Sequence, residues 1–191
     1  MLLEDIADIK TGLVTTRKKA DEDSEFIKKY MLLSLNAVDE NGSIDTSMLE
    51  EFQSVEELDE QYLTKQGDIL VRLNKPYTTV YIDKVNEGLV IPSYFIKLKV
   101  KDKSFKPGYI AWYLNSEKVK RIFLSMQSGT LVPSINQKIV RNIKVKEKTI
   151  EEQEEILELY KLYIKEIDLI EKFKKAREKQ FRGATAKLLE N

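Results

Sequence analysis

The strongest constraint on the fold is a long run of helix-forming residues toward the C-terminal end. The 33 residues from Thr149 to Phe181 include neither glycine nor proline, and almost all of them have a high helix propensity. Thr149 and Glu152 have the spacing of a capping box, which predicts where the helix begins. At about 1.5 Å per residue this helix is roughly 50 Å long. We therefore expect it to project and to pair with another helix.

Apolar residues recur along this helix in the pattern of a coiled coil. They follow one another at intervals of 4, 3, 4 and 3 residues, and we call them the seam: Ile156, Tyr160, Tyr163, Ile167 and Ile170. Such a seam predicts dimerisation through the helix. A helix that folds back over its own domain is the alternative that the pattern leaves open.

The first 148 residues predict an α+β domain with a mixed sheet. Apolar runs and period-two alternation predict strands at 30–35, 69–73, 78–83, 89–100 and 142–145. Helices are expected from Gln137, over 107–127, and over 54–63, where Ser54 and Glu57 have capping-box spacing. Tyr94 and Trp112 are expected in the core rather than on a base-stacking surface.

Two missing residue types exclude several kinds of chemistry. The sequence has no cysteine and no histidine, which excludes zinc sites of the Cys/His kind, thiol catalysis and histidine acid/base catalysis. A serine nucleophile and a carboxylate-only metal site stay open, but no motif supports either. Asp68 alone does not make a nuclease site, and a methyltransferase's glycine-rich loop and Asn/Asp-Pro-Pro motif are missing. We therefore expect no enzyme activity, no metal and no cofactor.

The N-terminal segment argues against export. It is charged by Glu4, and nowhere do about 18 apolar residues follow one another. We expect a soluble, cytoplasmic protein without a membrane partner.

Charge is unevenly distributed, although the formal net charge is zero. Residues 21–60, the acidic block, include 13 acidic and 2 basic residues. Residues 97–148, the basic block, include 13 basic and 3 acidic residues. Opposed blocks predict one face that repels phosphate and another that attracts it. Alternatively, the two blocks face each other and cancel.

Five segments carry a further signal through their order and spacing. They are Leu3–Gly12, Leu63–Leu70 with its Gly-Asp-Ile-Leu turn, Gly129–Ile143, the Glu-Glu-Gln segment Glu151–Ile156, and the basic, leucine-containing Lys174–Asn191. Together they resemble the specificity subunits of type I restriction-modification systems over nearly the whole chain. The sequence departs from that family in two ways. Lys146-Glu147-Lys148 replaces a Pro-x-Pro pair, and the chain has one domain and one long helix where the family has two of each.

The resemblance implies a half-length specificity subunit. Residues 1–148 would form the DNA target recognition domain, and residues 149–191 the long dimerisation or spacer helix and C-terminal tail. Two copies would pair antiparallel through the seam and read a bipartite inverted repeat in double-stranded DNA, with half-sites on the order of 10–15 base pairs apart. Modification (methyltransferase) and restriction subunits would be the partners that carry out the chemistry. The alternative from another class is a coiled-coil interaction or regulatory protein without DNA binding.

Three groups of polar residues are the candidate DNA contacts. The first is a basic cluster in the loop after Gly12: Arg17, Lys18 and Lys19. The second lies at the end of the central strand: Arg72, Asn74, Lys75 and Tyr77. The third flanks a glycine loop: Gln127, Ser128, Thr130, Ser134, Asn136 and Lys138.

Their expected roles follow from their side chains. Lysine, serine and threonine suit phosphate, arginine also suits guanine, and glutamine and asparagine suit adenine. Two alternatives remain open. The basic cluster could instead be solvated and balance the acidic residues 21–23, and Asn136 could instead cap the helix that begins at Gln137.

Overall fold

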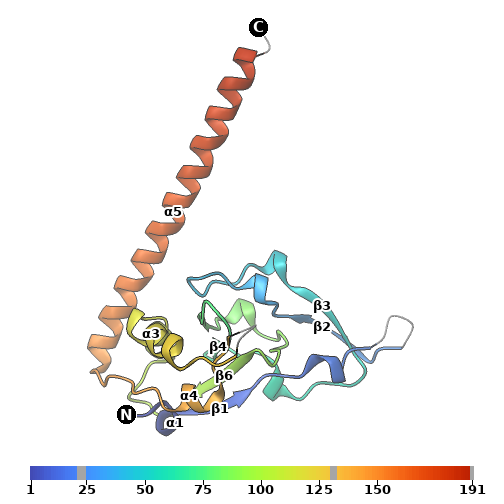
Figure 1. The fold of residues 1–191 in the computed structure, drawn as a ribbon, viewed down its shortest axis with the longest axis vertical. Coiled ribbons are helices and arrows are strands. Elements are labelled where there is room, and N and C mark those ends of the chain that lie inside the picture. The colour runs from blue at the N-terminus through green and yellow to red at the C-terminus, as the bar shows by residue number, and fades with distance from the viewer. Residues whose placement is uncertain (21–24, 130–132, 190–191) are drawn as a thin grey trace. The chain divides into compact units, whose positions relative to one another are not determined.

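The computed structural model describes residues 1–20, 25–129 and 133–189. It divides into two compact units, Met1–Gln153 and Glu154–Asn191. The first unit has antiparallel strands and short helices, and the second is helical, so the predicted α+β class with a long C-terminal helix is confirmed (Figure 1).

A four-stranded antiparallel sheet organises the first unit. Its strand order is β1 (Ala7–Thr11), β6 (Phe95–Val100), β4 (Ile69–Arg72) and β5 (Thr79–Tyr81). A separate hairpin pairs β2 (Lys28–Leu32) with β3 (Glu50–Ser54) and stands apart from this sheet (Figure 1). Parallel pairing occurs as isolated bridges, such as Leu13 with Pro92 and Leu32 with Val90.

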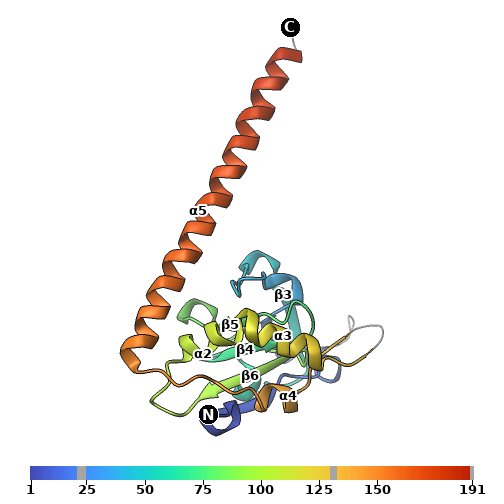
Figure 2. The ribbon, with the colours of Figure 1, turned by 60° about the vertical axis from the view of Figure 1, so that its left-hand side comes forward.

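Short helices cover the sheet. They are α1 (Leu3–Ile6), α2 (Pro107–Leu114), α3 (Glu117–Met126) and α4 (Gln137–Arg141). α2 packs beside β5 and α4 beside β1, and Figure 2 shows α2 close to β5. In the described part of the chain, five short 3-10 helices connect the other elements: Thr15–Arg17, Leu35–Ala37, Thr46–Met48, Glu60–Tyr62 and Lys84–Asn86.

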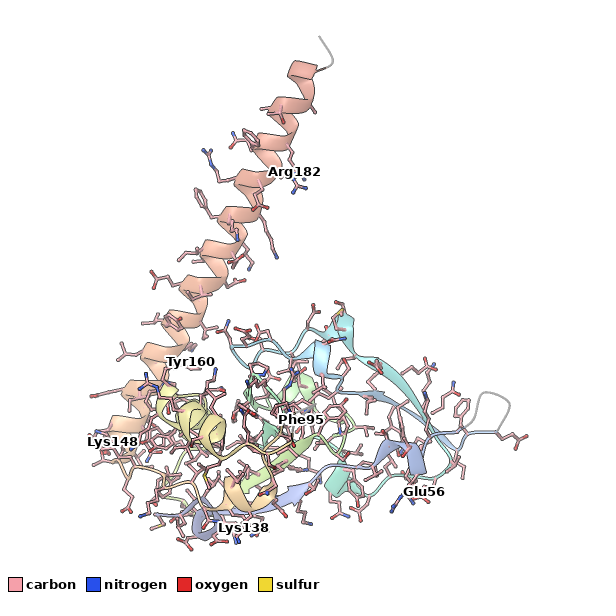
Figure 3. The ribbon with its side chains drawn as sticks, in the orientation of Figure 1. Glu56, Phe95, Lys138, Lys148, Tyr160 and Arg182 are labelled. Atoms are coloured by element: carbon pink, nitrogen blue, oxygen red, sulfur yellow. The ribbon has the colours of Figure 1, made fainter. Side chains whose placement is uncertain are left out.

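The core lies on both faces of the central strands. Leu70, Val80 and Phe95 are buried in a cluster that also includes Leu33 and Ile91, and Phe95 lies in the middle of the first unit in Figure 3. A second buried cluster holds the hairpin to the rest of the unit: Leu13, Tyr30, Phe52, Leu58 and Val90. Tyr94 packs against the first cluster and Trp112 stacks on Tyr109, with ring centroids 5.7 Å apart. Both side chains are half-buried, so they pack at the border of the core rather than inside it as expected.

The predicted helix over 54–63 is wrong. Ser54 instead ends β3, where it pairs with Lys28 of β2, and its hydroxyl accepts a hydrogen bond from the Glu56 amide at 3.4 Å. The only helical residues in this stretch are the 3-10 turn Glu60–Tyr62. Cross-strand pairing therefore overrode a capping pattern that is local to the sequence.

The predicted single helix over 107–127 is two helices, α2 and α3. They are separated at Asn115, whose side chain forms two hydrogen bonds with the backbone of Thr79 on β5. Its Oδ1 accepts from the Thr79 amide at 2.8 Å, and its Nδ2 donates to the Thr79 carbonyl at 2.7 Å. An asparagine that bonds to backbone in this way competes with helix continuation, so a tertiary contact sets the break.

Three strand predictions also need correction. β2 ends at Leu32 rather than at residue 35, and β6 begins at Phe95 rather than at residue 89. Residues 142–145 form no strand; Lys144 makes an isolated bridge with Leu2. The strand at 69–73 is confirmed as β4, and the one at 78–83 as the shorter β5.

The long helix α5 runs from Ile150 to Leu189. The predicted capping box is present, since the Thr149 amide donates to Glu152 at 2.9 Å and the Glu152 amide donates to Thr149 Oγ1 at 3.3 Å. The first turn belongs to the first unit. There the fully buried Gln153 accepts from the Lys106 amide at 2.8 Å and donates to the carbonyls of Ser104 and Lys148 at 2.7 and 2.9 Å.

Candidate nucleic-acid interface

Two of the three predicted groups meet in the structure. The segment after β4 and the segment after α3 are joined by an isolated bridge from Asn74 to Ser134, and a second bridge, from Ser134 to Ser128, lies within the segment after α3. The second bridge has two backbone hydrogen bonds, of 3.0 and 2.9 Å. We call this meeting point of residues 72–77, 127–129 and 133–138 the loop junction. The spacing in the sequence did not predict this contact, because it depends on how β4 and α3 pack.

Tyr77 connects the two halves of the loop junction from inside. Its ring is only 1% exposed and packs on Phe123, with ring centroids 5.9 Å apart. Its hydroxyl donates a hydrogen bond to Oε1 of Gln127. Burial raises the pKa of the Tyr77 hydroxyl, so the group stays protonated at neutral pH. Tyr77 therefore supports the surface in this structure, whereas we had expected it to contact DNA itself.

The other residues of the loop junction differ in exposure. Lys75, Ser128, Asn136 and Lys138 are exposed, and Asn74, Gln127 and Ser134 are half-buried; Figure 3 labels Lys138. Asn136 caps α4, because its Oδ1 accepts from the Ile139 amide at 3.1 Å. The capping alternative is thus observed, although the side chain is also accessible. Thr130 lies outside the described residues.

Arg72 points into the protein rather than straight outward. The guanidinium donates to the Leu35 carbonyl at 3.2 Å, and its Nε is buried without a partner among the described residues. Burial lowers the pKa of Arg72 and raises the pKa of the neighbouring Tyr94 to about 12. The Tyr94 hydroxyl donates to the Leu33 carbonyl at 3.2 Å. Arg72 therefore ties the end of β4 to the segment after β2.

The basic cluster belongs to another part of the first unit. The Val55 amide donates to the Lys18 carbonyl at 3.0 Å, and Lys19 bridges to Ser54. The Lys18 ammonium forms an ion pair with Glu56 at 2.7 Å, and Figure 3 shows Glu56 at the opposite end of this unit from Lys148. Arg17 and Lys19 are exposed. These cations therefore flank the β2–β3 hairpin and not the loop junction.

The acidic and basic blocks are neutralised by different partners. In the acidic block, glutamates pair with nearby lysines: Glu51 with Lys29, Glu56 with Lys18, Glu57 with Lys28, and Glu60 with Lys65. In the basic block, the pairs are Lys97 with Asp68, Lys101 with Asp8, Arg141 with Glu4, and Lys148 with Glu152. None of these pairs joins the acidic block to the basic block.

One buried ion pair could not be foreseen from the sequence. Lys97 and Asp68 lie 2.8 Å apart, with side chains 11% and 3% exposed. Lys97 also donates to the Leu63 carbonyl and Asp68 accepts from the Lys65 amide, both at 2.7 Å. The pair borders a cavity of about 380 Å³ whose lining carries both signs of charge, so it favours no simple anion. Within the described ranges, no cluster of three or more acidic side chains could hold a metal ion.

None of the helices in the described part of the chain has the length and apolar character needed to cross a membrane. No curated protein matches the chain in sequence. Among solved structures, the chain is similar to one from a study of complex assembly and conformational transition of the type I R-M system. The TM-score is 0.67 at 13% identity, over 91% of this chain and 43% of that one.

A second similar structure is the HsdS subunit from Thermoanaerobacter tengcongensis. Its TM-score is 0.66 at 14% identity, over 89% of this chain and 43% of that one. At these identities the likeness concerns the fold alone, and the chain spans less than half the length of either. In sequence, the model of the type I restriction modification DNA specificity domain matches residues 1–178, and the chain therefore belongs to that family.

Proposed function

We propose that this chain binds double-stranded DNA sequence-specifically and acts as a homodimer that reads a bipartite inverted repeat. Its role is to direct modification and restriction subunits to that site, while it carries out no chemistry itself. The observation that carries the DNA-reading part is the loop junction. Two polar segments some 50 residues apart in sequence are held together there, on a member of a DNA specificity family.

The loop junction offers both kinds of contact that a specific reader needs. Lys75 and Lys138 are exposed cations suited to phosphate, and Ser128 is an exposed hydroxyl. Gln127 and Asn136 have amide groups suited to base edges. The exposed Arg17 and Lys19, beside the hairpin, would add phosphate contacts at a second place on the duplex.

Charge on α5 favours antiparallel pairing with a second copy. Residues 151–158 include five glutamates and no basic residue, whereas residues 172–182 include six basic residues and one glutamate. An antiparallel pair places each acidic start beside a basic end, and a parallel pair places like charges together. The helix is thus complementary to a reversed copy of itself.

Apolar residues indicate one register for this pair. A two-fold axis at Lys165 sets Tyr160 opposite Ile170 and Tyr163 opposite Ile167 of the second copy, while the fifth seam residue, Ile156, lies opposite Lys174. The same register sets Leu159 beside Phe173, which are 69% and 68% exposed. Tyr163 and Ile170 are also more than half exposed, at 52% and 53%. A second copy would therefore cover apolar surface that the helix leaves open to water.

A gel-shift assay separates this function from a coiled-coil protein without DNA binding. We expect the protein to shift mixed duplex DNA at low salt. Replacing Lys75 and Lys138 with alanine should flatten the dependence of log K on log salt by about 0.9 for each lost phosphate contact. If the duplex stays unshifted at every salt concentration, even with protein in excess, the result would contradict DNA binding.

Co-expression with a candidate modification subunit tests the remaining part. Mapping the methylated bases should reveal an inverted repeat with two identical half-sites. The matched control is the Tyr163→Asp and Ile167→Asp double variant, which keeps the domain intact. Methylation that maps to a single undivided site in the wild type would refute the two-fold reading.

A further inference from the structure

The backbone at Tyr77 is unusual for an aromatic residue. Its φ is +58°, in the left-handed region that residues with a bulky side chain seldom adopt. The buried ring and its contact with Phe123 hold this conformation, and the Tyr77 amide donates to the Asn74 carbonyl at 2.9 Å. Such outliers persist where the surroundings fix them, and they gather at functional sites. At Tyr77, this backbone conformation places the side-chain hydroxyl against Gln127.

In the structure, the hydrogen bond from Tyr77 turns the oxygen end of the Gln127 amide inward. Oε1 is the end that accepts from the Tyr77 hydroxyl. Nε2, which carries two N–H donors, has no partner among the residues that the structure describes, and the side chain is half-buried. The backbone is held as well, because the next residue, Ser128, is paired with Ser134. Gln127 therefore presents donors.

We propose that Tyr77 is a positioning residue which makes Gln127 select guanine rather than adenine at one position of each half-site. This inference rests on the proposed DNA-reading function and names the base that one side chain reads. Glutamine recognises adenine when its oxygen accepts from N6 and its nitrogen donates to N7. With the oxygen turned inward, only the nitrogen meets the base. Guanine offers two acceptors there, O6 and N7, whereas adenine offers only N7 and places its N6 amino donor against the amide donor.

The experiment selects bound duplexes from a randomised pool with the full-length protein. The wild type should enrich guanine at one position of each half-site, and Gln127→Ala should lose that preference, which identifies the position. Tyr77→Phe keeps the ring and its packing on Phe123 but removes the hydroxyl, so the amide can turn over. We expect adenine to gain roughly tenfold relative to guanine there, the order of one bidentate contact.

A second variant keeps the proposal testable should Tyr77→Phe fail to fold, which circular dichroism would reveal. Gln127→Glu leaves Tyr77 in place and replaces the outward donor with an acceptor, so the preference should move to cytosine, whose N4 donates. A purely structural role for the hydrogen bond would lower the melting temperature without moving the base preference.

The outcomes separate the inference from the function on which it rests. If the wild type enriches adenine at the position that Gln127→Ala identifies, or if the variants that fold select the same bases as the wild type, the inference is overturned and DNA reading stands. If the wild type enriches no sequence at all, the proposed function itself fails.

Discussion

Replacing Gln153 with leucine removes the side chain that anchors the first turn of α5 to the first unit. Three hydrogen bonds to the backbone are lost, from the Lys106 amide and to the carbonyls of Ser104 and Lys148. Gln153 is fully buried, so water cannot easily replace it. A buried group left unpaired costs about 1–3 kcal/mol, and leucine regains part of this by apolar burial. We expect the free energy of unfolding to fall by about 3–5 kcal/mol, which is a large part of the 5–15 kcal/mol typical of a domain.

Trp112 makes this loss measurable in the first unit alone. It is the single tryptophan of the chain and stacks on Tyr109 within that unit, so its fluorescence during urea unfolding reports on the domain and not on the helix. At about 2–4 °C per kcal/mol the melting temperature should fall by roughly 10 °C. The control is Gln180→Leu on the exposed part of α5, where we expect a change within about 0.5 kcal/mol.

Gln153→Glu sharpens the same test, because a carboxylate oxygen would face the two carbonyls that now accept from Nε2. Only the protonated acid can donate there, so its pKa in the folded state should be raised above the unfolded value of about 4.3. Stability should then be highest below that value and be lost as pH rises through the raised pKa. If Gln153→Leu lowers the free energy of unfolding by less than about 1 kcal/mol, the proposed anchoring role of Gln153 is refuted.

Three further predictions concern the helix and the core. Tyr163→Asp with Ile167→Asp should yield monomers in sedimentation, and an unchanged mass would contradict pairing through the seam. Glu155→Lys with Glu158→Lys should weaken the dimer at low salt and much less at high salt, because screening removes the end-to-end attraction; equal affinity at low salt would show that charge does not set the orientation. Tyr94 has a pKa raised from 10 to about 12 by burial, so it contributes stability below pH 10 that is lost as pH rises toward 12; Tyr94→Phe should flatten that alkaline decline in urea unfolding, and an unaltered decline would assign it to other groups.

Local patterns predicted those parts of the fold that need no distant partner. The start of α5 follows from Thr149 and Glu152 alone, and the turn before β4 from Gly67, whose φ is +85°. The errors arose where a side chain responds to something far away in sequence. Ser54 looked like a helix cap but pairs with Lys28 across the hairpin, and Asn115 stops a helix by bonding to Thr79.

The candidate site shows the same difference between features that local sequence predicts and features that depend on distant residues. Polar residues at the end of β4 and around the glycine loop were predicted separately, and the bridge from Asn74 to Ser134 brings them together. Tyr77 was placed in the right segment, but its burial depends on Phe123, which is 46 residues away in sequence. Exposure cannot be read from residue type, so the sequence could not separate supporting side chains from exposed ones.

The proposed register links the helix to the spacing of the half-sites. With the two-fold axis at Lys165, Gln153 of one copy lies opposite residue 177 of the other, 24 residues along α5 from its own Gln153. At about 1.5 Å per residue, the two anchors are roughly 36 Å apart along the pair. That distance corresponds to roughly 10–11 base pairs at about 3.4 Å each, which is close to one helical turn and within the range implied by the family resemblance. Because two-fold readers bind half-sites about one turn apart on one side of the duplex, the anchor separation in the proposed register also suits an inverted repeat.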